Sequence, residues 1–491
     1  MSEQAAKMWS GRFREPLDPL FEQWQRSLLF DWLLLPQEIA ASKAHARTLA
    51  AAGILSPAEL ETTVGGLDRV LTRVGGPNAT QLTSAVPAIA NSPAEDIHHF
   101  VELELTREIG DLALKLHTGR SRNEQIATDL RLFVRDAIDN CVAQLVAWAG
   151  TLLEHADEAE SAAMPSYTHL QRAEPVLLAH WLLAYVEMIL RDIARFEDCR
   201  ARLNFCPLGS GAVAGATLAL DRSIAAQELK FTAPTANSMD ATSDRDFALE
   251  FAQVASTLGL HISRFAEEIT LYSTAEFGFV ELPEAFSTGS SAMPQKKNPD
   301  LTELLRGKSG RLLGAATTLA MLMKGLPLAY NKDLQETQEP VFEIAETLRG
   351  TLAVLPGFTA AVHFRHDRML SAAQTGFLNA MAAATYLVHK GLPFRKAHEK
   401  VGNAVRYCLD KECELGDLTL YELRQFGEEF EEDFFDAITL QATLDCHDVI
   451  GGTARARVRA AVESTEARVR ALAERYGVQF GTEEEAAHAG A

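Results

Sequence analysis

The stretch from residue 286 to 300 reads FSTGSSAMPQKKNPD and joins hydroxyl groups, a glycine and two lysines with almost no apolar bulk. Its last residues, Asn298-Pro299-Asp300, have the order of a helix start: an asparagine cap, a proline in the first turn and then an acid. Backbone N–H groups and the positive dipole end at a helix N-terminus attract anions. Because Lys296 and Lys297 add charge there, the stretch favours binding of a carboxylate or phosphate. The alternative is a polar surface loop that happens to cap a helix.

A second polar segment, residues 115–125, reads KLHTGRSRNEQ and precedes a long stretch of helical periodicity. Arg120 and Arg122 are suited to carboxylates, because a guanidinium group presents paired N–H donors in a fixed fork. Asn123 adds a neutral donor and acceptor beside them. The segment predicts an anion-binding loop, and a solvated basic turn is the other interpretation.

A third segment, residues 164–175, reads MPSYTHLQRAEP and contains Thr168 and His169. A histidine titrates near neutral pH and can therefore pass a proton to or from a reacting group. A single loop histidine is more often structural or merely exposed, so this segment predicts chemistry only together with the others.

Two shorter segments complete the set of polar loops. AYNKDLQET offers Tyr330 and Gln335, and EDIHHFVE offers Asp96 and His98. Asp96 and His98 lie two residues apart and could begin a metal site, but no third ligand follows at a recognisable spacing. We therefore expect no metal there.

Long helices must position these loops, because apolar residues recur at three- and four-residue steps over most of the chain. One predicted helix, residues 175–203, is apolar on nearly every side and should be buried all round. Strand signals are scarce, which predicts an all-α fold in which long helices pack as a bundle and polar loops converge at their ends. A core continued into partner subunits predicts a homo-oligomer. The five long helices are expected over residues 126–159, 175–203, 245–273, 299–324 and from 340 onward.

Two smaller helical regions are expected to flank this bundle. The predicted division is an N-terminal helical domain over residues 1–111, a central long-helix domain over 112–363 and a C-terminal helical domain over 364–491. A chain of 491 residues is too long for one simple core, which agrees with this division.

Composition limits the possible partners. The formal charge of −21 argues against a nucleic-acid or anionic-membrane surface, because both require a basic face. No apolar run is long enough to span a bilayer. The six cysteines form no CxxC pair and no zinc spacing, so we expect reduced thiols in a cytoplasmic protein.

The loops taken together resemble a known family. GSSAMPQKKNPD is similar to the signature loop of the fumarase/aspartase superfamily. With HTGRSRNEQIATD, YTHLQRAEP and AYNKDLQE, it makes nearly the whole chain similar to the argininosuccinate lyases and the related δ-crystallins of the lens. The resemblance implies a helical homotetramer with twenty central helices, five from each subunit, and active sites shared by three subunits. It also implies reversible anti β-elimination of argininosuccinate to arginine and fumarate, a step of arginine biosynthesis, without a cofactor.

The resemblance also implies roles for particular residues. Ser290 would be the base, Lys296 would lower its pKa and face the developing carboxylate charge, and Asn298 would orient the loop. His169 would act on the leaving group, with Thr168 beside it and Glu303 as the carboxylate that pairs with the histidine. The implied substrate-binding residues are Ser27, Asp96, His98, Arg120, Arg122, Asn123, Asn298, Tyr330, Gln335 and Gln338.

The chain departs from the family pattern at three places. Gln338 stands where the family usually carries a lysine, and loss of a charge-assisted hydrogen bond is worth roughly 1.5–3 kcal/mol. Glu124 and Glu38 replace aspartates and keep the charge. Gln338 keeps open a related lyase that adds a different amine to fumarate, and the lens proteins keep open an inert structural relative. The presence of Ser290 and His169 disfavours the inert relative.

Overall fold

The computed structural model describes residues 15–75, 87–159 and 161–479, and this part of the chain is built mainly of α-helices. It divides into two compact units, each assembled from three separate segments. The first unit comprises Met1–Asn140, Ala194–Thr257 and Gly310–Arg349, and the second comprises Cys141–Ile193, Leu258–Ser309 and Gly350–Ala491. The all-α prediction is confirmed, whereas the predicted division into three consecutive domains stays a prediction.

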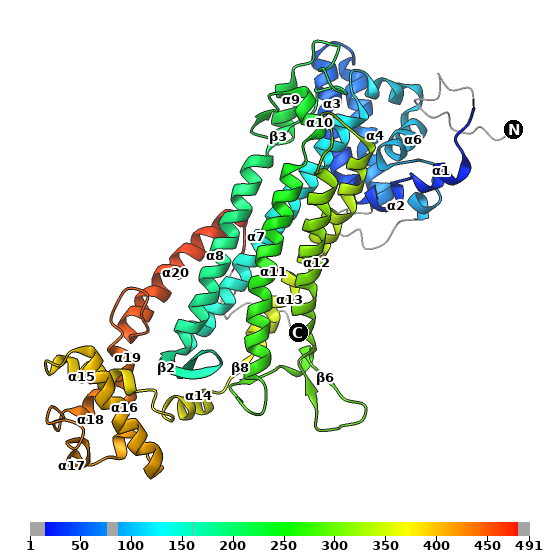
Figure 1. Cartoon of the computed structure of the whole chain (residues 1–491). Helices are drawn as coiled ribbons and strands as arrows, with labels where there is room; N and C mark the ends of the chain where they lie inside the picture. The colour runs from blue at the N-terminus through cyan, green and yellow to red at the C-terminus, as the bar shows by residue number, and fades with distance from the viewer. Residues whose placement is uncertain (1–14, 76–86, 160, 480–491) are drawn as a thin grey trace. The chain divides into compact units, whose positions relative to one another are not determined.

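Five helices of 24 residues or more are the longest in the described part of the chain, as the periodicity predicted (Figure 1). Each contributes one part to the first unit and the other part to the second. The second begins at Leu178 rather than at Pro175, because the residues before it form a strand. Their bounds are α7 Arg122–Glu158, α8 Leu178–Leu203, α11 Asp246–Tyr272, α12 Asp300–Met323 and α13 Gln338–Ala361.

In the first unit, short helices pack beside the ends of the long ones. Helices α3 (Leu35–Ala51), α4 (Pro57–Gly75) and α6 (Ile97–Ile109) lie side by side (Figure 1). Gly66 allows α4 to approach α6, because an added Cβ would meet Leu105 at 2.8 Å. The remaining elements are α1 Pro19–Trp24, α2 Leu28–Asp31, η2 Trp32–Leu34, α5 Pro87–Ala90, η3 Gly110–His117, α9 Arg222–Glu228, α10 Ser238–Ser243 and η5 Lys332–Thr337.

In the second unit, short helices gather around a separate apolar cluster (Figure 1). Its centre is formed by Phe430 and Phe434, whose rings meet edge to face at 5.0 Å between centroids. Burial of such aromatic side chains stabilises a small core strongly. The elements here are η4 Glu284–Phe286, α14 His366–Ala373, α15 Ala380–His389, α16 Phe394–Lys411, η6 Leu415–Asp417, α17 Leu420–Leu423, α18 Phe434–Ala437, α19 Leu440–Asp445 and α20 Arg455–Tyr476.

Strands occur only as pairs in the described part of the chain, and two of the pairs carry predicted site residues. Strands β1 (Ala163–Thr168) and β2 (Gln171–Leu177) form an antiparallel hairpin where the sequence predicted a loop and a helix start. Strands β6 (Thr288–Gly289) and β7 (Lys297–Asn298) also pair antiparallel and close the stretch that contains Ser290. The other pairs are β3 (Phe205–Cys206) with β4 (Ala233–Pro234), and β5 (Val280–Glu281) with β8 (His363–Phe364).

Two further features concern the chain as a whole. No helix within the described ranges is long and apolar enough to cross a membrane. All six cysteines are free thiols, and only Cys446 is exposed.

Candidate active site

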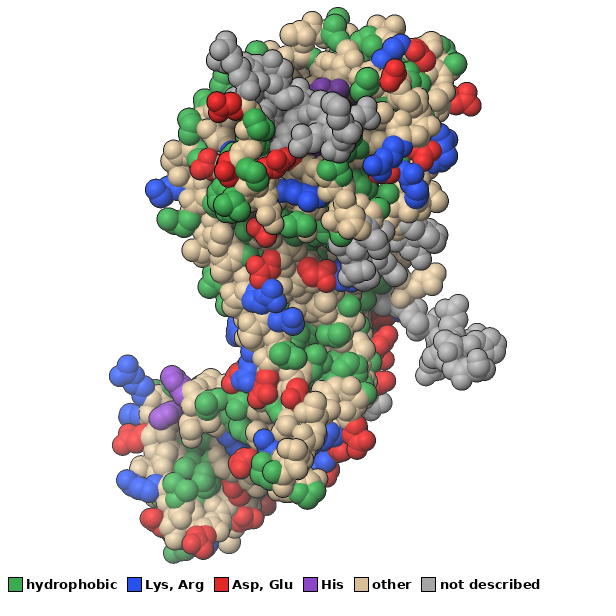
Figure 2. All heavy atoms as spheres, turned by 90° about the vertical axis from the view of Figure 1, so that its right-hand side faces the viewer, with side chains coloured by type: hydrophobic (Ala, Val, Ile, Leu, Met, Phe, Trp, Pro, Cys, Tyr) green, Lys and Arg blue, Asp and Glu red, His purple; other side chains and the backbone are tan. Residues whose placement is uncertain are grey.

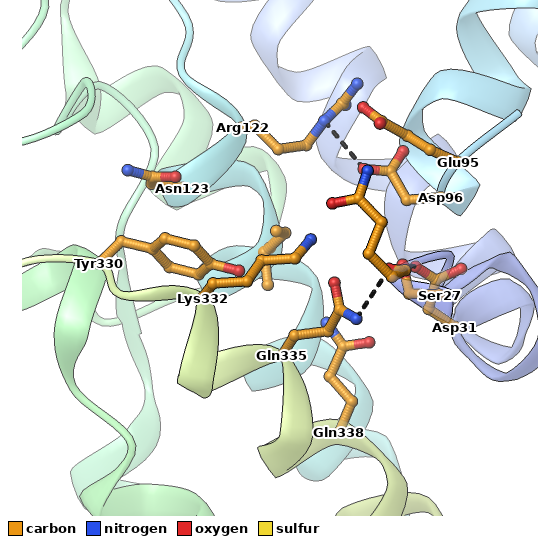
Figure 3. Close-up of a pocket in the computed structure, with 12 residues that line it drawn as sticks. Ser27, Asp31, Glu95, Asp96, Arg122, Asn123, Tyr330, Lys332, Gln335 and Gln338 are labelled. Atoms are coloured by element: carbon orange, nitrogen blue, oxygen red, sulfur yellow. Dashed lines mark hydrogen bonds and ion pairs between the residues drawn. The ribbon is translucent and has the colours of Figure 1, made fainter. Parts of the chain in front are cut away.

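The first unit contains a polar cavity of about 190 Å³ (Figure 3). Its walls come from three parts of the sequence that meet at the start of α7: the loop and helix α2, the turn before α6, and the segment around η5. The lining residues are Gln25, Ser27, Asp31, Glu95, Asp96, Arg122, Asn123, Ile126, Tyr330, Lys332, Gln335 and Gln338. The structure therefore brings together seven of the ten residues for which substrate contact was predicted.

Ser27 and Asp31 form one wall of this cavity. Ser27 stands at the N-terminus of α2, and its Oγ donates a hydrogen bond of 2.6 Å to Asp31 Oδ2. The backbone N–H of Ile97 donates to Asp31 Oδ1 at 3.0 Å. Burial, and then repulsion from Asp96, raise the pKa of Asp31 to about 7. A buried carboxyl group that forms no ion pair with a described residue therefore lines the cavity.

Asp96 and Arg122 form the second wall. Asp96 caps α6 by accepting a hydrogen bond of 2.7 Å from the backbone N–H of His99, as aspartate commonly does at a helix start. Its other oxygen lies 3.2 Å from Arg122 Nε. Burial alone would raise the pKa of Asp96, but the charges of Arg122 and His98 and the backbone N–H of His99 together outweigh burial and lower it. Arg122 is thus already committed to one carboxylate before any ligand enters.

The third wall belongs to the segment between α12 and α13. Gln335 Nε2 donates to the backbone oxygen of Gln25 at 3.1 Å, which ties η5 to the chain before α2. Gln338 is 2% exposed, and its Oε1 has no hydrogen-bond partner. Burial raises the pKa of Tyr330, so its hydroxyl keeps its proton and can donate at neutral pH.

Two predicted binding residues, His98 and Arg120, lie outside this cavity and line a much smaller one of about 10 Å³. His98 Nδ1 is 2.7 Å from Glu38 Oε2 and 3.2 Å from Asp129 Oδ2. Arg120 Nη1 donates to Ser42 Oγ at 2.9 Å, and Ser42 Oγ donates to Glu38 at 2.6 Å. These contacts place both residues in a buried ionic network behind the cavity wall.

Glu38, His98 and Asp129 also offer ligand atoms within 4.8 Å of one another, a geometry that could hold a metal ion. The sequence around His98 did not reveal this cluster, because Glu38 and Asp129 lie far from it in the chain, in α3 and α7. Gln125 Nε2 donates to both Glu38 oxygens at 2.7 Å, and His98 occupies one of them too. Because N–H donors already fill the Glu38 carboxylate, the cluster fits an internal ion pair better than a metal site.

The hairpin β1–β2 carries Thr168 and His169 in the second unit. Its two turn residues, His169 and Leu170, both have positive φ, at 55° and 58°. Two residues with positive φ are the requirement of the two-residue turn that suits a twisted hairpin, a role usually taken by Asn or Gly. Leu170 is also 68% exposed. Strained backbone in non-glycine residues is concentrated at functional sites, so the turn supports a function for His169.

The loop closed by β6 and β7 presents Ser290 at its start. Ser290 Oγ accepts hydrogen bonds from the backbone N–H groups of Ala292 at 3.2 Å and Met293 at 3.0 Å. Asn298 Nδ2 reaches back across the strand pair to Thr288 Oγ1 at 3.4 Å. The Lys296 side chain is exposed. The loop thus holds Ser290 in a turn that directs two N–H donors at its oxygen.

Glu303 follows this loop on the first turn of α12. In the described part of the chain its carboxylate lies 3.9 Å from Arg306 Nη2, and it forms no ion pair with His169. The predicted pairing of Glu303 with a histidine is therefore not made within one copy of these residues. Thr168, His169, Ser290, Lys296, Asn298 and Glu303 all belong to the second unit, whereas the cavity belongs to the first.

Sequence reasoning missed several residues that line the cavity. Asp31 gave no signal, because an isolated acid four residues after a serine is common on helix surfaces. Glu95 and Gln25 were not singled out either, since their neighbours carried the stronger pattern. Lys332 was noted in the AYNKDLQET segment but was assigned no role.

Comparison with known proteins shows the family to which the chain belongs. A family model described as Lyase matches residues 11–314, and one described as Argininosuccinate lyase C-terminal matches residues 377–445. The chain is 66% identical to the argininosuccinate lyase of Acidobacterium capsulatum over 94% of both chains. It is 56% identical to that of Koribacter versatilis over 95% of this chain and 98% of the relative.

Solved structures share the fold at lower identity. An EDDS lyase variant with bound fumarate aligns with a TM-score of 0.79 and 24% identity, covering 94% of this chain and 92% of that one. The 3-carboxy-cis,cis-muconate lactonizing enzyme of Pseudomonas putida aligns with a TM-score of 0.70 and 22% identity, covering 92% and 100%. Since the sequence relatives match over nearly their full length, the chain belongs to the argininosuccinate lyase family of carbon–nitrogen lyases.

Proposed function

We propose that Ser290 is the base in the reaction of this lyase, the reversible anti β-elimination that splits argininosuccinate into arginine and fumarate. The reaction removes a weakly acidic C–H proton beside a carboxylate while the C–N bond to the guanidino group breaks. The electron pair left on carbon is delocalised into the neighbouring carboxylate as a doubly charged aci-carboxylate. Donors fixed where this charge develops lower the barrier.

The loop around Ser290 supports this role. A serine hydroxyl is normally too weak an acid to act as a base, so its ionised form needs stabilisation. The N–H groups of Ala292 and Met293 already point at Ser290 Oγ and would stabilise an alkoxide there. Lys296 adds the full positive charge that faces the aci-carboxylate, and Asn298 holds the strand pair that closes the loop.

His169, Thr168 and Glu303 act on the leaving-group side. His169 moves the proton that the departing guanidino nitrogen needs, directly or through a water, and Thr168 contacts the substrate. Glu303 of another copy holds the imidazole ring and raises its basicity. The strained turn at His169 supports this assignment, because that backbone conformation is costly without a function.

The 190 Å³ cavity binds the arginine end of the substrate, and it is the observation that carries the proposal. It gathers Ser27, Asp96, Arg122, Asn123, Tyr330, Gln335 and Gln338, and these polar groups converge from separate parts of the sequence. The two residues outside it, His98 and Arg120, then support its wall from behind.

The active protein is a homotetramer with twenty central helices and with active sites shared between subunits. The cavity of about 190 Å³ is smaller than the roughly 300–1,000 Å³ of sites that enclose a ligand, so further residues must complete it. Helix α8, which was predicted to extend the core into a partner, is largely buried by its own chain. Helix α12 instead exposes Leu304, Leu313 and Met321 at 60%, 57% and 60%.

Glycines on the same helix support close packing against another copy. Gly307, Gly310 and Gly314 stand inside α12, and a Cβ added to any of them would meet nothing within 4 Å. A glycine inside a helix costs about 1 kcal/mol relative to alanine. Figure 2 shows hydrophobic side chains open to solvent among the charged ones on the face that it presents. Small and apolar residues on an exposed helix suit an interface between helices of different subunits.

A cytoplasmic location is proposed from the cysteines. All six are free thiols, and none is paired in a disulfide. Free thiols are kept reduced in the cytoplasm.

The deciding experiment follows fumarate by ultraviolet absorbance while purified protein cleaves argininosuccinate. Ser290→Ala should lower kcat by about 10²–10⁴-fold, the usual contribution of a positioned base, and leave the assembly intact. Ser291→Ala is the matched control and should retain activity, because its neighbour supplies the base. Near-wild-type kcat in Ser290→Ala would remove Ser290 from this role.

A second candidate is a lyase of the same superfamily that adds a different amine to fumarate. Gln338 favours it, since a neutral amide lines the cavity at this position. Turnover of fumarate with another amine, and none with arginine, would select this candidate. A correctly assembled protein without any turnover would select an inert structural relative.

A further inference from the structure

The amide of Gln338 has an unmet hydrogen-bonding group inside the cavity. Its side chain is 2% exposed, and Oε1 has no partner among the described residues. Buried polar atoms are nearly always satisfied in folded proteins, so a specific exception calls for a ligand or a water. The group without a partner is an acceptor, and it therefore calls for a donor.

The two neighbouring donors of this wall, Gln335 and Ser27, are already committed to other acceptors. Gln335 Nε2 already donates to the Gln25 backbone oxygen at 3.1 Å. Ser27 Oγ donates its single hydrogen to Asp31 at 2.6 Å. Figure 3 shows the Gln335 and Gln338 side chains reaching into the cavity on the side where Ser27 and Asp31 lie.

The charges around the cavity point to a cationic donor. The Asp31 carboxylate is 1% exposed, and the hydrogen bonds that it accepts come from neutral groups, the Ser27 hydroxyl and the Ile97 N–H. Arg122 is paired with Asp96 at 3.2 Å and does not compensate Asp31. A carboxylate oxygen, a hydroxyl lone pair and an amide oxygen thus form a set of acceptors, which matches the three N–H donors of an ammonium group.

A carboxylate group on the ligand would find fewer cationic partners in the same cavity. Arg122 is taken by Asp96, and Lys332 is an exposed residue, so water and salt weaken its attraction. A neutral amide at position 338 adds no positive charge. The cavity therefore offers buried acceptors to a cationic group of the ligand, whereas a carboxylate of the ligand would meet only the solvent-exposed Lys332.

We propose that Gln338, together with Asp31 and Ser27, forms a subsite for the ammonium group of the amine substrate, so that this chain selects its amine by the ammonium group rather than by the carboxylate. The inference rests on the proposed function of the cavity as the binding site for the arginine end. It makes Gln338 a specificity-determining residue.

The test runs the reaction in the direction of addition to fumarate, with three guanidino compounds. Arginine carries both groups, agmatine carries the ammonium group without the carboxylate, and 5-guanidinopentanoate carries the carboxylate without the ammonium group. The loss of fumarate absorbance gives kcat/KM for each compound. The wild type should use agmatine within about tenfold of arginine and use 5-guanidinopentanoate at least tenfold less well than agmatine, as expected for one lost charge-assisted hydrogen bond.

Two variants at the same position separate charge from shape. Gln338→Lys should reverse the order of agmatine and 5-guanidinopentanoate, because it replaces an acceptor by a cation. Gln338→Met keeps the size and removes the acceptor, so it should reduce kcat/KM for arginine and agmatine by about tenfold and leave 5-guanidinopentanoate unchanged. Gln227→Lys on the exposed face of α9 is the control for added charge and should change no ratio.

Three outcomes overturn the inference while leaving the proposed function standing. These are a wild type that prefers 5-guanidinopentanoate to agmatine, a Gln338→Lys variant that keeps the wild-type order, and a Gln338→Met variant that shifts all three compounds by one factor. No turnover with arginine in the wild type would instead refute the proposed function, and the inference with it.

Discussion

At the scale of single residues, the buried cluster of Glu38, His98 and Asp129 shifts the pKa values of its own members. Burial alone would lower the pKa of His98, but Glu38 and Asp129 outweigh burial and raise it to about 10. Burial, and then Glu38, raise the pKa of Asp129 well above its ordinary value. His98 is therefore a buried imidazolium that joins α3, α6 and α7.

The raised pKa of His98 predicts that the stability of the protein depends on pH. A group whose pKa is raised on folding stabilises the protein fully below its unfolded pKa of 6.5 and loses that stabilisation as pH rises toward about 10. The free energy of unfolding of the wild type should therefore exceed that of His98→Gln at pH 6.5, and the difference should shrink by pH 10. Urea unfolding of both proteins at several pH values measures it. A difference that stays constant with pH would show that His98 is neutral in the folded protein.

Residue types drew attention to several residues of the cavity, because its polar side chains sit in short motifs with unusual density, and the family resemblance gave them their predicted role. Asn123, Tyr330 and Gln335 were identified in this way. Asp31 was not, since only the packing of α2 against the turn before α6 gives it a role. The placement of His98 and Arg120 behind the wall also could not be predicted, because tertiary packing decides which of two cavities a side chain enters.

At the scale of elements, the hairpin β1–β2 is the part that the sequence concealed. Pro175 and the apolar run after it resembled a helix start, yet the helix begins at Leu178. Leu170 gave no turn signal, because leucine rarely adopts a positive φ. The five long helices were predictable, since their periodicity persists over many turns and no single residue decides it.

The turn predicts a stabilising substitution. Leu170 at φ 58° pays a conformational cost of roughly 1–2 kcal/mol that asparagine largely avoids. Because Leu170 is 68% exposed, little apolar burial is lost. Leu170→Asn should therefore raise Tm without changing kcat, as measured by thermal unfolding and fumarate release. Leu409→Asn, at an exposed position within α16, should give no such gain; an equal gain there would mean that replacing any exposed leucine stabilises the protein, whatever its φ.

At the scale of the whole molecule, the exposed face of α12 bears on assembly. Gly314 offers open space around its Cα, and Leu313 beside it is 57% exposed. A helix from another copy can approach closely only if the residue at position 314 is small and uncharged.

Gly314→Glu should therefore dissociate the proposed tetramer and remove activity together. Light scattering after gel filtration gives the mass, and fumarate release gives the activity. Gly402→Glu in α16 is the matched control, because this glycine is also exposed, inside a helix and free of neighbours within 4 Å. A tetrameric and fully active Gly314→Glu protein would move the subunit interface away from this face.

The small volume of the cavity has a kinetic consequence. If the 190 Å³ on one chain holds only part of the substrate, a solitary chain lacks the rest of the catalytic groups. The rate per chain then depends on protein concentration, and it falls once dilution passes the dissociation constant of the assembly. Dilution alone would inhibit the enzyme, and concentrating the sample would restore its rate.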